Sequence, residues 1–367
     1  HKARDGRFTP SLSAREAELL GIVQGMKRAG RGVIEVNSDF GPGEFEALEA
    51  AATLAGRPLS CLLVQVDAQP ELWRDTLANI HRMRATGREA NAQVGSRPIG
   101  VIMGLETTVH PFVAHPVWRE LRDLTPTERY RRLLADADLR QRLLAPRTEG
   151  GAPAFMGEAF HKMFPIADRP DYEPDLANSV AAIAERSGRT PHEVALEAIL
   201  ALDGKGLLML PFENYAAGSL DVVHEMITDP ATVLGVADGG AHVGVICDAS
   251  SPTSLLTLWG RDRTRGPRLS LEFLIAKQTR GTALSYGLAD RGLLVPGHKA
   301  DINIIDFDAL SLKRPEVVYD LPAGGRRLIQ RASGYRHTFV SGVETVRDDE
   351  LTGERPGRLV RGAQTVM

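Results

Sequence analysis

The chain has 367 residues, of which 43% are hydrophobic and 25% are charged, a balance typical of a soluble globular protein with one large domain or two ordinary ones. Its net charge of −3 argues against binding to nucleic acid or to an anionic membrane surface, and no apolar run approaches the roughly 20 residues of a membrane span. With two cysteines and no signal peptide, the sequence favours a cytoplasmic protein without a disulfide framework.

The first hundred residues alternate between helical and strand patterns. The predicted helices cover 13–29, 45–55 and 70–87, and the predicted strands cover 33–36, 59–66 and 90–94. Ser13 and Glu16 form an expected capping box at the start of the first helix. The short connections favour βα units and a parallel sheet. Polar residues follow each strand, which is where parallel α/β proteins place their chemistry.

The alternation breaks between about residues 105 and 202, where prolines, a basic run and a glycine-containing loop indicate a long, mostly helical insertion. Thr190 is the expected N-cap of its last helix. A buried strand is then expected at 206–212, followed by a helix at 220–228.

The stretch from 232 to 250 carries the strongest functional signal. An apolar strand at 233–236 runs directly into Asp238, two glycines and His242. An acid and a histidine at a strand exit suit a general base or a metal ligand. The same residues also suit a turn with a capping aspartate and a structural histidine, so the spacing alone leaves both interpretations open.

Helices are expected at 253–260 and 270–282, the second capped by Ser270. From residue 295 the pattern changes to a small β unit. This unit has a strand around Ile302 and Ile304, and two further strands on either side of the turn at 340–343.

Four passages together resemble a known family. They are ADGGAHVG at 237–244, QTRGTA at 278–283, YGLADRGLLVPGHKADINIIDFD at 286–308 and the closing HTFVSGVETVRDDELTGERPGRLVRG. The last two passages resemble the carboxy-terminal part of the amidohydrolase superfamily. Within it the chain is similar to the D-aminoacylase-like branch, amidohydrolase family 3, whose members include N-acyl-D-amino-acid deacylases.

This resemblance implies an α/β fold in which residues 1–294 form part of a (β/α)8 TIM barrel, interrupted by the insertion, and residues 295–367 form a small β-sandwich portion. It implies a bacterial-type, metal-dependent hydrolase that cleaves a C–N amide bond in a small molecule, with zinc as the expected divalent metal. Asp238 looks like the last-strand acid that moves a proton from the metal-activated water to the leaving group. The resemblance leaves open whether the protein forms a homo-oligomer.

The His-x-His metal motif of the family's first barrel strand would lie upstream of His1. The chain does not begin with a methionine, and we therefore expect a fragment that is inactive alone. His1 itself precedes the first strand, in a region that contacts substrate in the resembling enzymes, and is a candidate substrate-binding residue.

Two strands depart from the family pattern. In the deacylases the fifth and sixth barrel strands each end in a metal-ligand histidine. The matching segments here, VIEVNSDF and LSCLLVQVD, offer Asn37, Ser38 and Gln65 instead. Two alternatives therefore stay open. One is hydrolysis of a cyclic amide or related C–N bond on the same scaffold, and the other is a degenerate barrel that binds a ligand without turnover.

The remaining candidates are two histidines and three arginines. His110 and His242 are the candidate metal ligands, each with a structural role as the alternative. Arg97, at a strand exit, could clamp a substrate carboxylate or form an ordinary salt bridge. Arg261 and Arg263, in the loop WGRDRTRG, could line a cationic rim for an acidic substrate or form ion pairs within a solvated loop.

Overall fold

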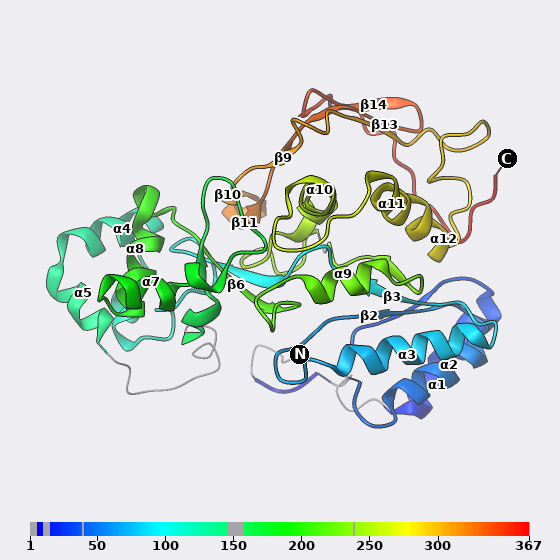
Figure 1. The fold of residues 1–367 in the computed structure, drawn as a ribbon, viewed down its shortest axis with the longest axis horizontal. Helices are drawn as coiled ribbons and strands as arrows, with labels where there is room; N and C mark the ends of the chain where they lie inside the picture. The colour runs from blue at the N-terminus through cyan, green and yellow to red at the C-terminus, as the bar shows by residue number, and fades with distance from the viewer. Residues whose placement is uncertain (1–5, 10–14, 39, 146–157, 238, 367) are drawn as a thin grey trace.

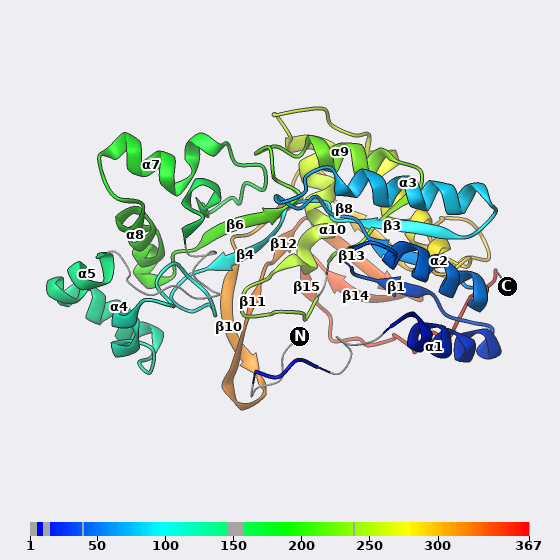
Figure 2. The same cartoon turned by 90° about the horizontal axis from the view of Figure 1, so that it is seen from below.

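The computed structural model of the chain describes residues 6–9, 15–38, 40–145, 158–237 and 239–366. It has three parts: a parallel sheet with its helices, a helical insertion, and a carboxy-terminal part with antiparallel strands (Figure 1). The insertion extends away from the parallel sheet in both views (Figure 2). The predicted α/β class is confirmed. None of the helices in the described ranges combines the length and apolar character that a membrane span requires.

The parallel sheet has the strand order β1-β2-β3-β7. Its strands are β1 (Ile34–Val36), β2 (Leu59–Leu62), β3 (Ala90–Val94) and β7 (Thr232–Leu234). Each neighbouring pair is parallel, which confirms the βα units predicted from the alternation. Strand β2 ends at residue 62 rather than at the expected 66. Within the described residues this sheet is open, with β1 and β7 at its two edges.

Four helices pack beside this sheet. They are α1 (Glu16–Ala29), α2 (Glu44–Ala55), α3 (Leu72–Ala85) and α9 (Asp221–Thr228). Helix α1 has no side-chain cap at Arg15, and the expected cap Ser13 lies outside the described residues. Gly30 and Gly56 end α1 and α2 in the left-handed conformation that favours glycine.

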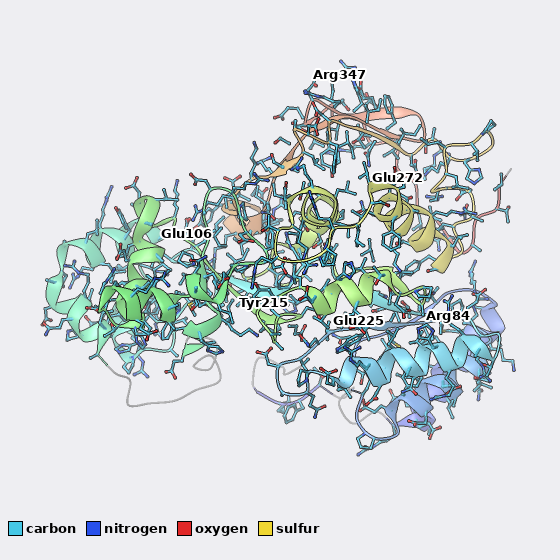
Figure 3. All side chains as sticks on the ribbon, viewed as in Figure 1. Arg84, Glu106, Tyr215, Glu225, Glu272 and Arg347 are labelled. Atoms are coloured by element: carbon cyan, nitrogen blue, oxygen red, sulfur yellow. The ribbon has the colours of Figure 1, made fainter. Side chains whose placement is uncertain are left out.

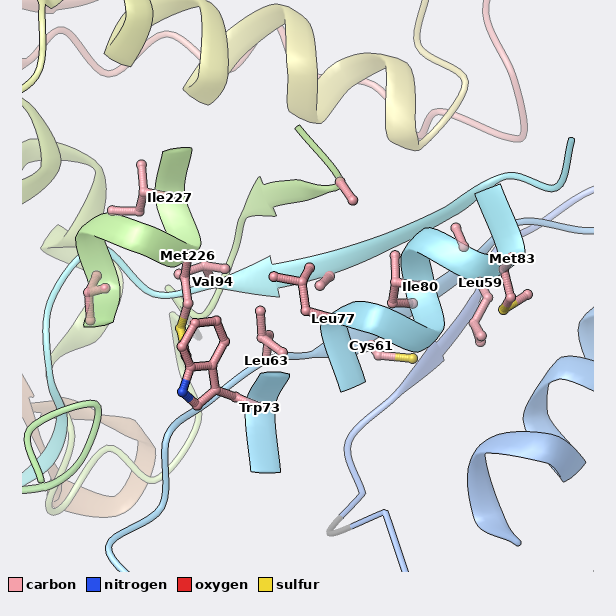
Figure 4. Close-up of a cluster of buried hydrophobic side chains, with 14 of the residues drawn as sticks. Leu59, Cys61, Leu63, Trp73, Leu77, Ile80, Met83, Val94, Met226 and Ile227 are labelled. Carbon is pink, nitrogen blue, oxygen red and sulfur yellow. The ribbon is translucent and has the colours of Figure 1, made fainter. Parts of the chain in front are cut away.

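The main core fills the space between these helices and the sheet. Leu59, Ile80 and Val94 are fully buried there, and Trp73 of α3 is buried in the same core beside Met226 (Figure 4). The apolar positions on α3 follow helical spacing, so one face of the helix is buried and the other carries arginines. This packing fixes the strand ends on which the candidate site depends.

The strand expected at 206–212 forms, but outside the parallel sheet. Strand β6 (Leu208–Glu213) pairs antiparallel with β4 (Ile99–Met103), and the short β5 (Phe164–Pro165) pairs with its other edge. Gly100 allows this close pairing, because a Cβ there would lie 2.5 Å from the carbonyl oxygen of Leu210. The antiparallel sheet joins the parallel sheet to the helical insertion.

The insertion has a hydrophobic core of its own. Its helices are α4 (Pro126–Ala135), α5 (Ala137–Leu144), α7 (Val180–Ser187) and α8 (Pro191–Gly204). Thr190 caps α8 as predicted, in a capping box with Glu193. The described part of the insertion is therefore mostly helical, as its sequence indicates.

The carboxy-terminal part begins with helical segments that pack on the main core. They are α10 (Ser251–Ser254), a π-helix at Leu255–Asp262, α11 (Leu271–Ala276), a second π-helix at Lys277–Gly281 and α12 (Thr282–Ser285). Ser270 caps α11 as expected.

The remaining strands are all antiparallel. They are β8 (Ile302–Ile305), β9 (Ser311–Leu312), β10 (Glu316–Leu321), β11 (Gly325–Ile329), β12 (Ala332–Ser333), β13 (Tyr335–Val340), β14 (Val343–Arg347) and β15 (Glu350–Leu351). The largest sheet has the order β15-β14-β13-β8, and it contains the hairpin predicted around 340–343. The β10–β11 hairpin reaches toward the insertion (Figure 1).

Candidate functional site

The carboxyl ends of the parallel strands carry polar residues without a histidine. Asn37 and Ser38 follow β1, residues 65–67 follow β2, and Ser96 and Arg97 follow β3. In parallel α/β proteins ligands bind at this edge of the sheet. Asp238, the proposed acid after β7, lies outside the described residues, and so does His1.

Gln65 connects β2 to the turn after β6. Its backbone N–H donates to Asn214 Oδ1 at 2.8 Å, and its carbonyl accepts from the Asn214 N–H at 2.8 Å. The Gln65 amide oxygen also accepts from the Ala216 N–H at 3.2 Å. The Gln65 side chain is thus used to hold a turn.

The segment after residue 238 is held by three other parts of the fold. The carbonyls of Val243, Gly244 and Val245 accept from the N–H groups of Leu328, Thr108 and Ile102, at 2.7, 2.9 and 2.7 Å. Leu328 belongs to β11, whereas Ile102 and Thr108 belong to the antiparallel sheet and the insertion. Because the donors come from elements far apart in sequence, the backbone of this segment has a fixed path.

His242 directly precedes the three held carbonyls, and its side chain is exposed. Its φ of 46° is in the left-handed region, and its carbonyl accepts from the N–H groups of Val245 and Ile246 at 2.8 and 3.0 Å. His242 therefore forms a tight turn, and its role as a metal ligand stays a prediction.

Arg97 lies in a buried cluster at the end of β3. Its Nη2 donates to Cys247 O at 2.7 Å and to Asp248 Oδ1 at 2.9 Å, and its guanidinium stacks 4.1 Å from the Tyr172 ring centroid. Nη1 donates to Gln330 Oε1 at 3.3 Å, whereas Nε has no acceptor among the described residues. The predicted strand-exit arginine thus neutralises an internal carboxylate here, and its contact with a substrate stays a prediction.

His110 is buried within the insertion. Its Nδ1 accepts from the Phe112 N–H at 3.2 Å, and its ring lies 4.1 Å from the Trp118 ring in an edge-on arrangement. Burial lowers the pKa of His110 to about 3, with a further contribution from Arg129. These contacts give His110 a packing role, while its metal-binding role stays a prediction.

Across the described ranges, no three histidine, cysteine, aspartate or glutamate side chains come together as a metal site. Neither His110 nor His242 therefore belongs to a group of three such side chains within the described ranges.

Arg261 joins the first π-helix to the turn after β8. Its guanidinium donates to the carbonyls of Phe307, Asp308 and Leu310, the last at 2.7 Å, and it pairs with Asp262 at 2.8 Å. Arg261 thus pairs with groups of the protein itself, and its substrate-binding role stays a prediction.

Arg263 is fully buried and bridges the insertion and α9. It forms two hydrogen bonds of 2.9 Å to the Glu173 carboxylate, one of 2.7 Å to Asp221 and one of 3.1 Å to Pro267 O. Its guanidinium lies 4.7 Å from the Trp259 ring centroid. Each guanidinium nitrogen has a protein acceptor, so Arg263 forms a buried ionic junction, and its substrate-binding role stays a prediction.

The sequence analysis did not predict one charged pair that lies at the strand ends. Lys162 Nζ lies 2.8 and 2.6 Å from the two Asp67 carboxylate oxygens, and the Lys162 side chain is 7% exposed. Asp67 could be recognised in the sequence as a polar residue that follows a predicted strand. Its partner Lys162, however, is 95 residues away in the insertion. No local spacing connects the two, so only the tertiary fold identifies the pair.

Residues 2–346 match the family model described as the amidohydrolase family. The chain belongs to the amidohydrolase family. Over 108 residues it is 32% identical to an N-acyl-D-glutamate deacylase of Alcaligenes xylosoxydans xylosoxydans, an alignment that covers 29% of this chain and 20% of that protein.

Two solved D-aminoacylase structures share the fold. One is a mutant in complex with CuCl2, with a TM-score of 0.53 and 19% identity over 96% of this chain and 60% of that one. The other defines a novel subset of amidohydrolases, with a TM-score of 0.51 and 18% identity over 95% and 59%. The chain thus spans about three-fifths of the solved relatives, and the predicted D-aminoacylase-like resemblance is confirmed.

The buried ionic junction predicts a large stability effect. We expect Arg263→Met to lower the free energy of unfolding by about 3–5 kcal/mol, because it leaves the Glu173 carboxylate buried without its cation. Urea unfolding followed by circular dichroism measures the change. Arg327→Met, which removes an exposed pair with Asp320, is the control and should change stability far less. Equal effects of the two substitutions would contradict the structural role of Arg263.

Burial of His110 predicts a pH-dependent stability. The pKa of His110 in the folded state is below the ordinary 6.5, so the unfolded state binds the extra proton as the pH falls below that value. Stability is therefore lost between about pH 6.5 and 3. From pH 7 to 5 we expect the wild type to lose about 2 kcal/mol more than His110→Asn, whose amide does not titrate.

Urea unfolding at the two pH values measures this difference, and His161→Asn, at an exposed histidine, serves as the control. Parallel pH profiles for the wild type and His110→Asn would show that His110 is not buried in its neutral form.

Proposed function

We propose that this chain belongs to an enzyme that hydrolyses a C–N amide bond, with an N-acyl-D-amino acid as substrate. The observation that carries this proposal is the family match over residues 2–346. The shared fold with two D-aminoacylases and the local similarity to an N-acyl-D-glutamate deacylase support the substrate class.

The family implies a divalent metal, and zinc remains our prediction. The described residues do not fit such a site by themselves, because they contain no cluster of three ligands and Gln65 is used in a turn. We therefore assign no step to a metal. What this chain would supply is Asp238, whose carboxylate would accept a proton from the attacking water and return it to the leaving amine.

A second candidate function is ligand binding without turnover. The observation that favours it is the same lack of a metal cluster among the described side chains, together with Asn37 and Gln65 at the strand ends. The two functions differ in whether a substrate is consumed, so one assay separates them.

The assay follows release of free amino acid from N-acetyl-D-glutamate and other N-acetyl-D- and N-acetyl-L-amino acids, with and without added zinc. We expect turnover of a D-substrate, and we expect Asp238→Asn to lower kcat by about 100-fold or more, since a positioned proton-transfer group contributes at least that much. Asp123→Asn, which changes a carboxylate that is 88% exposed, is the matched control and should keep full activity.

Circular dichroism of each variant checks that the fold is retained. Saturable binding of the N-acyl amino acids without turnover would replace the hydrolase proposal by the ligand-binding one. Full activity of Asp238→Asn would contradict the role of Asp238 while leaving the hydrolase proposal in place.

A further inference from the structure

A cavity of about 820 Å³ lies at the amino-terminal ends of β3 and β7. Ala90, the first residue of β3, and Thr232, the first residue of β7, line it. Because the strands are parallel, this edge of the sheet is opposite to the one at which Arg97 follows β3. Figure 3 shows Arg84, which also lines the cavity, at the end of α3 that lies away from the insertion. The volume is within the range of about 300–1,000 Å³ that is usual for small-molecule sites.

Basic side chains dominate the walls of this cavity. Glu89 supplies one carboxylate, and the basic residues that line the cavity are Arg84, Arg88, Lys277 and Arg280. Arg88 pairs with Glu49, which is not part of the cavity lining, at 3.3 Å. The other three cations leave an excess of positive charge over Glu89. A concave surface lined mainly by charges of one sign attracts ions of the opposite sign.

Arg84 and Arg280 contact only uncharged acceptors among the described residues. Arg84 Nη1 donates to Ala90 O at 3.0 Å and to Asn91 Oδ1 at 3.1 Å. Arg280 Nη1 donates to two backbone carbonyls of the loop that follows α12, at 3.0 and 3.1 Å. These bonds fix one nitrogen of each guanidinium and do not neutralise its charge. A guanidinium held in this way offers its remaining N–H groups to an oxyanion.

Lys277 lies near Arg84, and within the described ranges no carboxylate is at ion-pair distance from it. Its Nζ donates to Asp229 O at 2.7 Å, whereas the Asp229 carboxylate pairs with His81 at 2.9 Å. Burial lowers the pKa of Lys277 to about 8. The Asp229 carboxylate opposes this shift, and the Arg84 charge adds to it. Two neighbouring cations repel each other, and an anion bound between them relieves that repulsion.

The remaining wall of the cavity is largely apolar. Phe273, Ala276 and Leu284 line it beside the cations, and Lys277 Nζ lies 6.0 Å from the Phe273 ring centroid. Apolar surface next to a few convergent charged groups is typical of sites for small organic molecules. The walls therefore suit a molecule with an anionic group and an organic body.

We infer that this cavity binds a small organic molecule that carries a phosphate group, with Arg84, Lys277 and Arg280 around the phosphate oxygens. A phosphate group carries about 1.5–2 negative charges at pH 7 and has three strong acceptor oxygens, which matches three cations better than a carboxylate does. This inference does not rest on the proposed hydrolysis. The cavity lies at the start of β7, whereas residue 238 follows the end of that strand.

The test measures binding of phenyl phosphate by isothermal titration calorimetry in about 0.15 M salt, which screens distant surface charges. We expect saturable binding, with the Kd raised about ten- to hundredfold by Arg84→Gln or by Lys277→Gln, since each removes a charged hydrogen-bond donor. Arg82→Gln is the matched control. It removes the same charge from an exposed position on α3 that does not line the cavity, so it should leave the Kd unchanged.

Benzoate, which has the same ring and a single charge, should bind more weakly than phenyl phosphate, and tighter binding of benzoate would overturn the phosphate class of ligand. The inference is also overturned if phenyl phosphate does not bind the wild type, or if Arg82→Gln weakens binding as much as Arg84→Gln does. Displacement of phenyl phosphate by N-acetyl-D-glutamate would overturn its assignment to this cavity. Because Arg84 is on the surface, its variant keeps the test decisive even where Lys277→Gln impairs folding.

Discussion

The need to pair every buried backbone group explains how the three parts of this chain are joined. The carbonyls at 243–245 receive their hydrogen bonds from β4, from the loop after it and from β11. Arg97 then holds the next residues through Cys247 O and Asp248. Since unpaired carbonyls in such a position would be costly, the insertion and the β10–β11 hairpin have to stay in place for this segment to keep its path.

Local signals in the sequence predicted much of the fold. The βα units, the N-cap at Thr190 and the hairpin around 340–343 depend on contacts between near neighbours, and all three are present. The pairing of β6 with β4 was not predictable in the same way. An apolar run indicates a buried strand, but it does not reveal which strand lies beside it or in which direction.

The candidate side chains show the same limit. The position of Arg97 after a strand suggested a clamp for a substrate carboxylate or an ordinary salt bridge, and its carboxylate partner Asp248 lies 151 residues further along. Arg263 and Glu173 are 90 residues apart. Residue type and spacing identify a charged group that needs a partner, whereas only the fold decides whether that partner is substrate or protein.

The polar groups near the strand ends differ in whether they have a hydrogen-bond or ion-pair partner among the described residues. Gln65 and Arg263 are satisfied by neighbouring backbone and carboxylates, and the Lys162 ammonium pairs with Asp67. Trp73 Nε1, by contrast, is buried without an acceptor among the described residues. Paired groups stabilise the fold, while an unpaired buried donor costs free energy. The contacts of these groups therefore hold the strand ends in place, whereas the substrate-binding roles of Arg261 and Arg263 stay predictions.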